Sequence, residues 1–210
     1  MPDFSYEQSA MSKGYTCIVG LDEVGRGCLA GPLVAGAVVL ETKEPQWIVG
    51  VDDSKKISPT KREKLSEAIK LNAKAWSIGL VQPADLDKWG LTKSTENAMK
   101  HAILGLGLEP DYLLLDYVPL DSWEQPHDVI KQGDSKSYSI AAASIIAKVY
   151  RDNLMVQIAS KYPRYDFASN KGYGSKAHMN ALSLYGPCDI HRQSFTPVQE
   201  ASGKSYIERT

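Results

Sequence analysis

The sequence predicts an α/β fold with a mixed sheet whose first strands are antiparallel. Two short apolar runs, residues 17–21 and 33–40, lie on either side of a glycine-rich loop, which is typical of paired buried strands. Segments with helical and strand periodicity then alternate along the chain, as expected of an α/β sheet. A chain of 210 residues is long enough for one well-buried core and gives no reason to expect two full domains.

The individual elements follow from apolar spacing and from the residues at their boundaries. Ser58 and Pro59 suit the N-cap and first position of a helix that continues to about Leu71. A second helix begins near Thr92 and ends before Gly105. The remaining strands are expected over 73–81, over 112–115 and near 129–130, and the remaining helices from 139 to before 163 and over 175–184.

Composition sets limits on the class of protein. Hydrophobic residues make up 43% and charged residues 23%, which is ordinary for a soluble globular protein. The net charge is −1, so binding of a polyanion would need a local basic patch. We expect residues 15–198 to form one domain, with residues 1–14 as an irregular lead-in and residues 199–210 as a polar tail.

Cysteine content and the first residues indicate the compartment. The three cysteines, Cys17, Cys28 and Cys188, are widely spaced, which argues against a disulfide framework and against structural zinc. Residues 1–14 do not resemble a signal peptide, and no apolar run approaches the length of a membrane span. We therefore expect a reduced, cytoplasmic, monomeric protein that does not contact membranes.

Acidic residues follow two of the predicted strands. Asp22 and Asp116 each end an apolar run, so the two carboxylates would stand side by side if these strands are parallel neighbours. Glu23 would share the site with Asp22 only if the backbone turns there, because successive strand residues face opposite sides. Asp134 precedes the long helix and could reach the same place. The simpler interpretation of Asp134 alone is an acid that interacts with the helix dipole, and that of Asp22 with Glu23 is a solvated turn.

Carboxylates near the glycine loop point to phosphodiester chemistry. Oxygen donors without Cys or His favour a hard cation such as Mg²⁺ or Mn²⁺. Two such ions would activate a water and stabilise the leaving oxygen of a displacement at phosphorus. The loop residues Gly25, Arg26 and Gly27 could bring backbone N–H groups and a positive charge close to an anion.

Several further motifs stand in a fixed order along the chain. They are Gly20 to Gly27, Ala30-Gly31-Pro32, Asp53-Ser54-Lys55-Lys56, Leu115-Asp116, Gly133 to Lys136, Ala141 to Val149, Arg151-Asp152, Lys171 to Ser175 with His178, and Gly186-Pro187 with His191, Arg192, Ser194 and Phe195. In order and spacing these motifs resemble ribonuclease HII, a type 2 ribonuclease H, over about residues 15–198.

The resemblance implies a fold and an activity. The fold would be RNase H-like, with a central five-stranded mixed sheet flanked by helices and a carboxy-terminal helical segment. The activity would be cleavage of RNA in RNA–DNA hybrids and 5′ of single ribonucleotides in duplex DNA, leaving 3′-hydroxyl and 5′-phosphate ends. Two Mg²⁺ or Mn²⁺ ions would be held by the matched acids, which are Asp22, Glu23, Asp116 and Asp134.

The resemblance also implies substrate contacts. Gly25, Arg26 and Gly27 match the family loop that reads the 2′-hydroxyl, the group that distinguishes RNA from DNA. Tyr173 matches a tyrosine that packs on the sugar after the ribonucleotide; without the match, a half-buried loop tyrosine is equally good. Phosphate contacts are expected from four cations, each of which taken singly reads as a solvated surface residue: Lys55, Lys136, Lys171 and Arg192.

Alternative functions differ in what they predict. A ribonuclease HIII-like enzyme would carry an additional amino-terminal substrate-binding domain, which does not fit here. A catalytically silent hybrid-binding protein would bind without cutting, and another nuclease of the same fold would cut all-DNA substrates. The preferred metal, a replication-clamp partner and a role for Cys28 cannot be read from the sequence. The histidines His178 and His191 are not assigned to metal.

Overall fold

The computed structural model describes residues 1–42, 46–48, 50–54, 57–120 and 123–203. The chain forms two compact units. The sheet unit comprises Met1–Val24, Val34–Leu80 and Thr95–Val149, and the helical unit comprises Gly25–Leu33, Val81–Ser94 and Tyr150–Thr210. The expected single domain over residues 15–198 stays a prediction.

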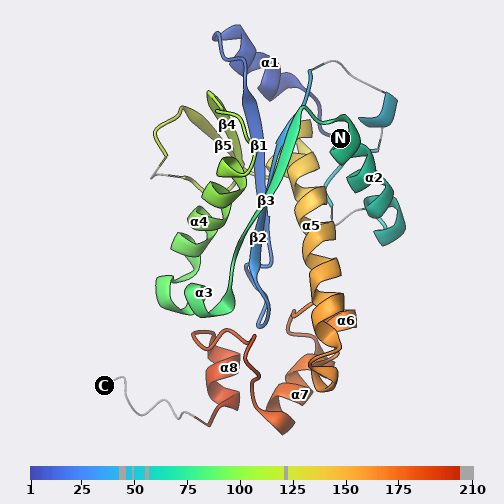
Figure 1. Cartoon of the computed structure of the whole chain (residues 1–210), viewed down its shortest axis with the longest axis vertical. Coiled ribbons are helices and arrows are strands. Elements are labelled where there is room, and N and C mark those ends of the chain that lie inside the picture. The colour runs from blue at the N-terminus through green and yellow to red at the C-terminus, as the bar shows by residue number, and fades with distance from the viewer. Residues whose placement is uncertain (43–45, 49, 55–56, 121–122, 204–210) are drawn as a thin grey trace. The chain divides into compact units, whose positions relative to one another are not determined.

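A five-stranded mixed sheet forms the centre of the sheet unit (Figure 1). Its strand order is β3-β2-β1-β4-β5, and the strands are β1 (Ile18–Val24), β2 (Leu33–Val39), β3 (Ala75–Val81), β4 (Tyr112–Asp116) and β5 (His127–Ile130). Strands β1 and β2 pair antiparallel, whereas β1 with β4 and β4 with β5 pair parallel. The predicted mixed sheet, with the first two strands antiparallel, is confirmed.

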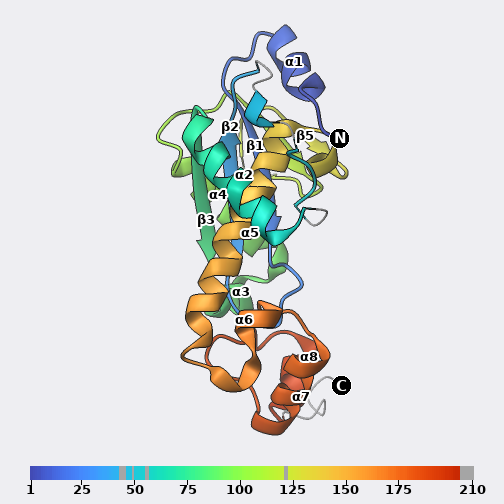
Figure 2. The same cartoon turned by 90° about the vertical axis from the view of Figure 1, so that its right-hand side faces the viewer.

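Helices cover both faces of this sheet. Figure 1 shows α4 (Leu91–Leu104) on one side, and α2 (Pro59–Asn72) and α5 (Tyr138–Ala159) on the other. The view turned by 90° places α2 and α5 over the strands (Figure 2). One apolar cluster joins Val38 of β2, Leu65 and Ile69 of α2 and the small residues at the start of α5. Burial of these apolar side chains holds α2 and α5 against the sheet.

Helix α5 approaches the sheet with no side chain between the two backbones. A Cβ atom at Gly20 of β1 would overlap the main chain of Ser139, and one at Gly36 of β2 would overlap the carbonyl oxygen of Ala143. The small residues at the start of α5 permit this close approach. The helix therefore lies directly against the strand that carries Asp22.

The expectation of an irregular segment over residues 1–14 is wrong. Residues Ser5–Ser12 form α1, in which Glu7 and Ala10 are buried. The apolar periodicity of this short helix is weak, and its stability comes from tertiary packing of Phe4 and Ala10 into two core clusters. Helix α3 (Pro83–Trp89) was also unexpected, because Pro83 ends the strand and at the same time occupies the first turn of a helix.

Short helices make up the rest of the helical unit. They are η3 (Pro163–Tyr165), α6 (Phe167–Asn170), α7 (Lys176–Tyr185) and α8 (Thr196–Ala201), the last of which extends into the expected polar tail over residues 199–210. Their apolar contacts include Met155, Tyr165 and Phe167 in one cluster and Leu182 with Val198 in another. Among the residues that the structure describes, no helix has the length and apolar character needed to cross a bilayer.

Candidate active site

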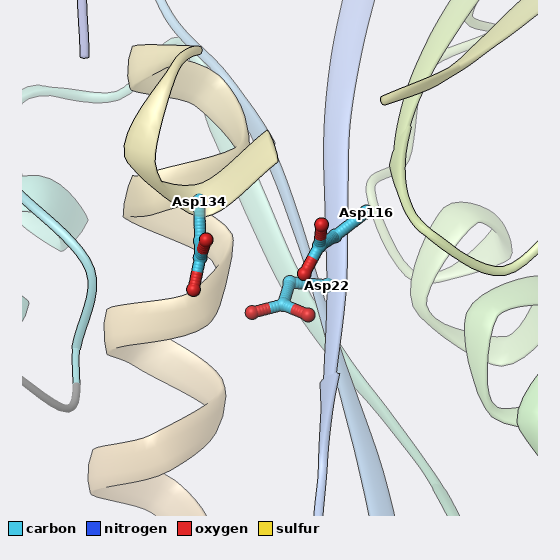
Figure 3. Close-up of side chains that lie close together, drawn as sticks. All are labelled: Asp22, Asp116 and Asp134. Atoms are coloured by element: carbon cyan, nitrogen blue, oxygen red, sulfur yellow. The ribbon is translucent and has the colours of Figure 1, made fainter. Parts of the chain in front are cut away.

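Three carboxylates from separate parts of the chain meet in the sheet unit. One oxygen from each of Asp22, Asp116 and Asp134 lies within 4.8 Å of the other two. Figure 3 shows the three side chains directed toward one another, between β1 and the start of α5. Asp22 and Asp134 are each 5% exposed, and Asp116 is half-buried. A group of this kind is able to hold a divalent cation.

The fold explains why these acids converge. Leu21 pairs with Leu115 in the parallel β1–β4 ladder, so Asp22 and Asp116, the next residues of these two neighbouring strands, lie side by side. Asp134 lies in the short helix η2 (Gly133–Ser135) just before α5. The backbone N–H of Gly133 donates to Asp116 Oδ1 at 2.8 Å, which ties the second acid to the segment of the third.

Electrostatics in the cluster oppose the charged state of Asp22. Burial, followed by repulsion from Glu23, Asp116 and Asp134, raises the pKa of the Asp22 carboxyl well above its usual range. A hydrogen bond from Ser144 acts in the opposite direction. Bringing carboxylates together in this way costs free energy that a bound cation would offset.

Ser144 is a site residue that the sequence analysis missed. Its hydroxyl bonds to the Asp22 carboxylate, and its Oγ lies 2.9 Å from the Oγ of buried Ser54. The only signal in the sequence is a hydroxyl on the apolar face of the helix at 141–146. Since Ser54 and Ser144 are ninety residues apart, their contact could not be read from local pattern.

Glu23 lies outside the group of three. Strand β1 continues through Val24 with regular pairing to β2, so Asp22 and Glu23 face opposite sides of the sheet. The Glu23 backbone N–H donates to Asp22 Oδ1 at 2.7 Å. The charge of Glu23 still acts on Asp22, because it is the second cause of the raised Asp22 pKa.

Two buried arginines hold the loop Gly25–Pro32 in the helical unit. Arg151 donates to the carbonyl oxygens of Pro32, Lys171 and Ala30 at 2.8–3.1 Å. A Cβ atom at Gly25, whose φ is +90°, would collide with the Arg151 side chain. Both the backbone angle and the neighbouring arginine therefore require glycine at this position.

Arg192 is the second of these arginines, and its placement corrects a prediction. Its guanidinium group donates to Arg26 O at 2.8 Å and twice to Gly31 O at 3.0 and 3.1 Å, and the residue is 0% exposed. A buried group that donates to the protein backbone is not available to a phosphate. Arg192 supports the loop, contrary to the expected phosphate contact.

The other predicted substrate residues are distributed as follows. Tyr173 is 39% exposed, and the Arg151 guanidinium lies 5.7 Å from its ring centroid. Arg26 and Lys171 are half-buried and Gly27 and Lys136 are exposed, whereas Lys55 lies outside the described residues. The neighbouring backbone is well tied, because Gly172 O accepts from Leu29 N and Ala30 N at 2.9 and 3.3 Å.

Comparison with known sequences identifies the family. The protein-family model of ribonuclease HII matches residues 19–198, a range that contains every predicted site residue. The chain belongs to the ribonuclease HII family. The ribonuclease HII of Caldicellulosiruptor bescii is 48% identical over 192 residues, which are 91% of this chain and 92% of the relative. That of Bacillus subtilis strain 168 is 48% identical over 195 residues, 93% of this chain and 75% of the relative.

Solved structures agree with the family assignment. The ribonuclease H2 of Pyrococcus horikoshii OT3 superposes with a TM-score of 0.75 at 26% identity, over 90% of this chain and 98% of that one. A Bst ribonuclease HIII solved with Mn²⁺ gives a TM-score of 0.66 at 18% identity, over 94% of this chain and 73% of that one, and supports the fold alone. The expected RNase H-like fold is thus confirmed, and membership of the ribonuclease HII family supports a nuclease.

Proposed function

We propose that the protein is a metal-dependent endoribonuclease that cleaves the RNA strand of RNA–DNA hybrids. We further propose that it cuts 5′ of single ribonucleotides in duplex DNA, leaving 3′-hydroxyl and 5′-phosphate ends. The observation that carries the proposal is the meeting of Asp22, Asp116 and Asp134 within 4.8 Å, in a member of the ribonuclease HII family.

The donor set fits Mg²⁺ or Mn²⁺. All candidate ligand atoms are carboxylate oxygens, which hard divalent cations prefer. Burial first, and then repulsion from the neighbouring acids, raises the pKa of Asp22, and this concentration of negative charge favours a cation. When bound, two such ions supply an activated water and stabilise the leaving oxygen at phosphorus. The resemblance to the family implies Glu23 as a further ligand; it lies outside the group of three, and its charge acts on Asp22.

Recognition of the ribonucleotide is assigned to the loop at residues 25–27, to Tyr173 and to two lysines. The backbone of Gly25, Arg26 and Gly27 would contact the 2′-hydroxyl, and buried Arg192 supports that backbone by donating to the Arg26 carbonyl oxygen. The exposed face of Tyr173 would pack on the following sugar, and Lys136 and Lys171 would contact phosphates. Since one chain supplies all of these groups, we propose a monomeric enzyme.

The decisive assay uses a DNA duplex with one ribonucleotide, incubated with Mg²⁺ or Mn²⁺ and, separately, with a chelator. We expect cleavage 5′ of the ribonucleotide with either metal and none with the chelator. A uniform RNA–DNA hybrid should also be cut, and an all-DNA duplex of the same sequence should not. Cutting of the all-DNA duplex would favour a different nuclease of this fold, and binding without any cutting would favour a hybrid-binding protein.

Tyr173→Ala tests the recognition part of the proposal. Loss of a stacking ring is expected to lower kcat/KM about tenfold on the single-ribonucleotide duplex and less on the uniform hybrid. Tyr185→Ala removes an exposed tyrosine of α7, which also lies beside an arginine, and serves as the control. An equal loss on both substrates would remove the proposed role of Tyr173.

A further inference from the structure

The first seven residues contact the segment that carries Asp134. Glu7 of α1 is 1% exposed, and its Oε1 accepts from the Ser137 hydroxyl at 2.7 Å and from the backbone N–H of Ser139 at 2.9 Å. The Ser137 Oγ in turn accepts from the Ile140 N–H at 3.2 Å. These donors belong to the first turn of α5, where backbone N–H groups have no partner within the helix.

Asp3 adds backbone contacts to the same segment. Its N–H donates to Lys136 O and its carbonyl oxygen accepts from Tyr138 N–H, both at 3.1 Å, so Asp3 and Ser137 form a parallel bridge. The ring of Phe4 lies 5.0 Å from that of Tyr138, centroid to centroid. Residues 3–7 thus contact the chain through backbone, carboxylate and ring, two to five residues after Asp134.

This segment needs such support because Asp134 carries charge into an acidic cluster. The N–H groups of Lys136 and Ser137 both donate to Gly133 O at 2.9 Å, which closes the turn that contains Asp134. The negative charge of Asp134 also helps to raise the pKa of Asp22, so without a cation the two carboxylates repel each other. Repulsion would displace Asp134 unless the backbone on its carboxyl side were fixed.

We propose that Glu7 is a positioning residue for the metal site, which through Ser137 and Ser139 fixes the turn that presents Asp134. The inference rests on the proposed function, because it concerns the proposed metal ligand Asp134. It goes beyond the matched family range, which begins at residue 19. Fixing a ligand before the cation arrives lowers the free-energy cost of binding, as for other groups that orient ligands from outside the coordination shell.

The test compares Glu7→Ala, Glu7→Gln and a matched control in the whole chain. Asp111→Ala is the control, because Asp111 also accepts three hydrogen bonds, from the N–H and hydroxyl of Thr16 and the N–H of Cys17. It lies at the opposite end of β4 from Asp116. The affinity for Mn²⁺ is measured without substrate by electron paramagnetic resonance of the free ion, well below the unfolding temperature of each variant.

Glu7→Ala should weaken Mn²⁺ binding about tenfold, the lower end of the loss when an outer-shell partner is removed. Asp111→Ala should leave the affinity unchanged although it also destabilises the fold. Glu7→Gln keeps an acceptor oxygen and should bind within about twofold of wild type. An unchanged Mn²⁺ affinity in Glu7→Ala overturns the proposal. So does a loss of affinity in Glu7→Gln equal to that in Glu7→Ala, because it would show that only the charge of Glu7 matters.

Hydrogen exchange of the metal-free protein separates this inference from the proposed function. The Lys136 and Ser137 amides, which do not bond to Glu7, should exchange faster in Glu7→Ala than in wild type or Asp111→Ala. Unchanged exchange would show that Glu7 does not fix the turn, whether or not the protein binds Mn²⁺. Absence of Mn²⁺ binding by wild type would instead contradict the proposed function. If Glu7→Ala does not fold, Ser137→Ala is measured with the same expected directions.

Discussion

His178 Nε2 and His191 Nε2 lie 3.0 Å apart in the interior of the helical unit, and their other contacts fix where each proton resides. The Cys188 N–H can only donate, and it lies 2.9 Å from His191 Nδ1, closer than the Cys188 carbonyl oxygen at 3.3 Å, so we assign the proton of His191 to Nε2. The Tyr173 carbonyl oxygen can only accept, and it lies 2.8 Å from His178 Nδ1, so that nitrogen carries the proton. Both ends therefore require the same arrangement, with His191 donating to His178.

This arrangement predicts a loss of stability in mild acid. Burial, followed by the neighbouring His178, lowers the pKa of His191 from 6.5 to about 4, and burial also lowers the pKa of His178. The unfolded chain then takes up the proton first, so stability is fully present above pH 6.5 and falls as the pH drops toward 4. Thermal unfolding measured across this range should show a falling midpoint.

The variant His191→Asn isolates this contribution. The raised pKa of Asp22 contributes with the opposite sign, so the relevant quantity is the difference between wild type and variant. The variant should lose less stability between pH 6.5 and 4 than wild type does. Parallel pH profiles would contradict the neutral histidine pair.

Asp22→Asn and Asp116→Asn should each reduce cleavage by more than about 100-fold, because a ligand itself matters more than an outer-shell partner. The free energy of unfolding at neutral pH should stay level or rise, since each change removes charge from a repelling cluster. Single-turnover cleavage and urea unfolding measure the two effects. Asp189→Asn, an exposed acid outside the cluster, is the control and should cleave normally. Normal turnover by both site variants would refute the ligand assignment.

Arg192→Lys should destabilise the protein by about 3 kcal/mol in urea unfolding. Lysine lacks the planar fork that reaches Arg26 O and Gly31 O together, so a buried carbonyl oxygen loses its partner. KM for the single-ribonucleotide duplex should rise as the loop loosens. Arg164→Lys, an exposed arginine beside Tyr185, is the control and should change stability by less than about 0.5 kcal/mol. Equal stability of the two variants would contradict the supporting role of Arg192.

Gly36→Ala should cost about 1–3 kcal/mol of stability, because the added methyl group meets the Ala143 carbonyl oxygen. Gly36 pairs with Asp22 across the β1–β2 ladder, and Ser144 follows Ala143, so the shift should also weaken the Ser144 contact and lower cleavage. Gly27→Ala, where a Cβ would meet open space, should leave stability unchanged. Urea unfolding and single-turnover cleavage measure the two effects. A Gly36→Ala variant as stable as wild type would disprove the close contact.

The sequence predicted those features of the fold and the site that depend on residues close together in the chain. Apolar runs marked β1, β2 and β4, and the acids that follow two parallel strands indicated where Asp22 and Asp116 would meet. Residues that act over long separations were missed or misread. Arg192 lies 161 positions from Gly31, and in the sequence a buried arginine that supports a loop looks the same as an exposed phosphate contact.

Local pattern also failed where tertiary packing outweighs helix propensity. Helix α1 has weak periodicity, and only the fold reveals that Glu7 faces a helix start about 130 positions away. Regular alternation along β1 set the condition that Glu23 joins Asp22 only at a backbone turn, and β1 runs with regular pairing through Val24, so Glu23 as a ligand stays a prediction.

The contacts of Gly20 and Gly36 with the main chain of α5 have a consequence for how this enzyme family can change. Peptide atoms have fixed dimensions, so the separation between Asp22 on the strand and Ser144 on the helix does not depend on the volume of any core side chain. Substitutions elsewhere in the interior can therefore accumulate without altering the spacing between Asp22 and Ser144.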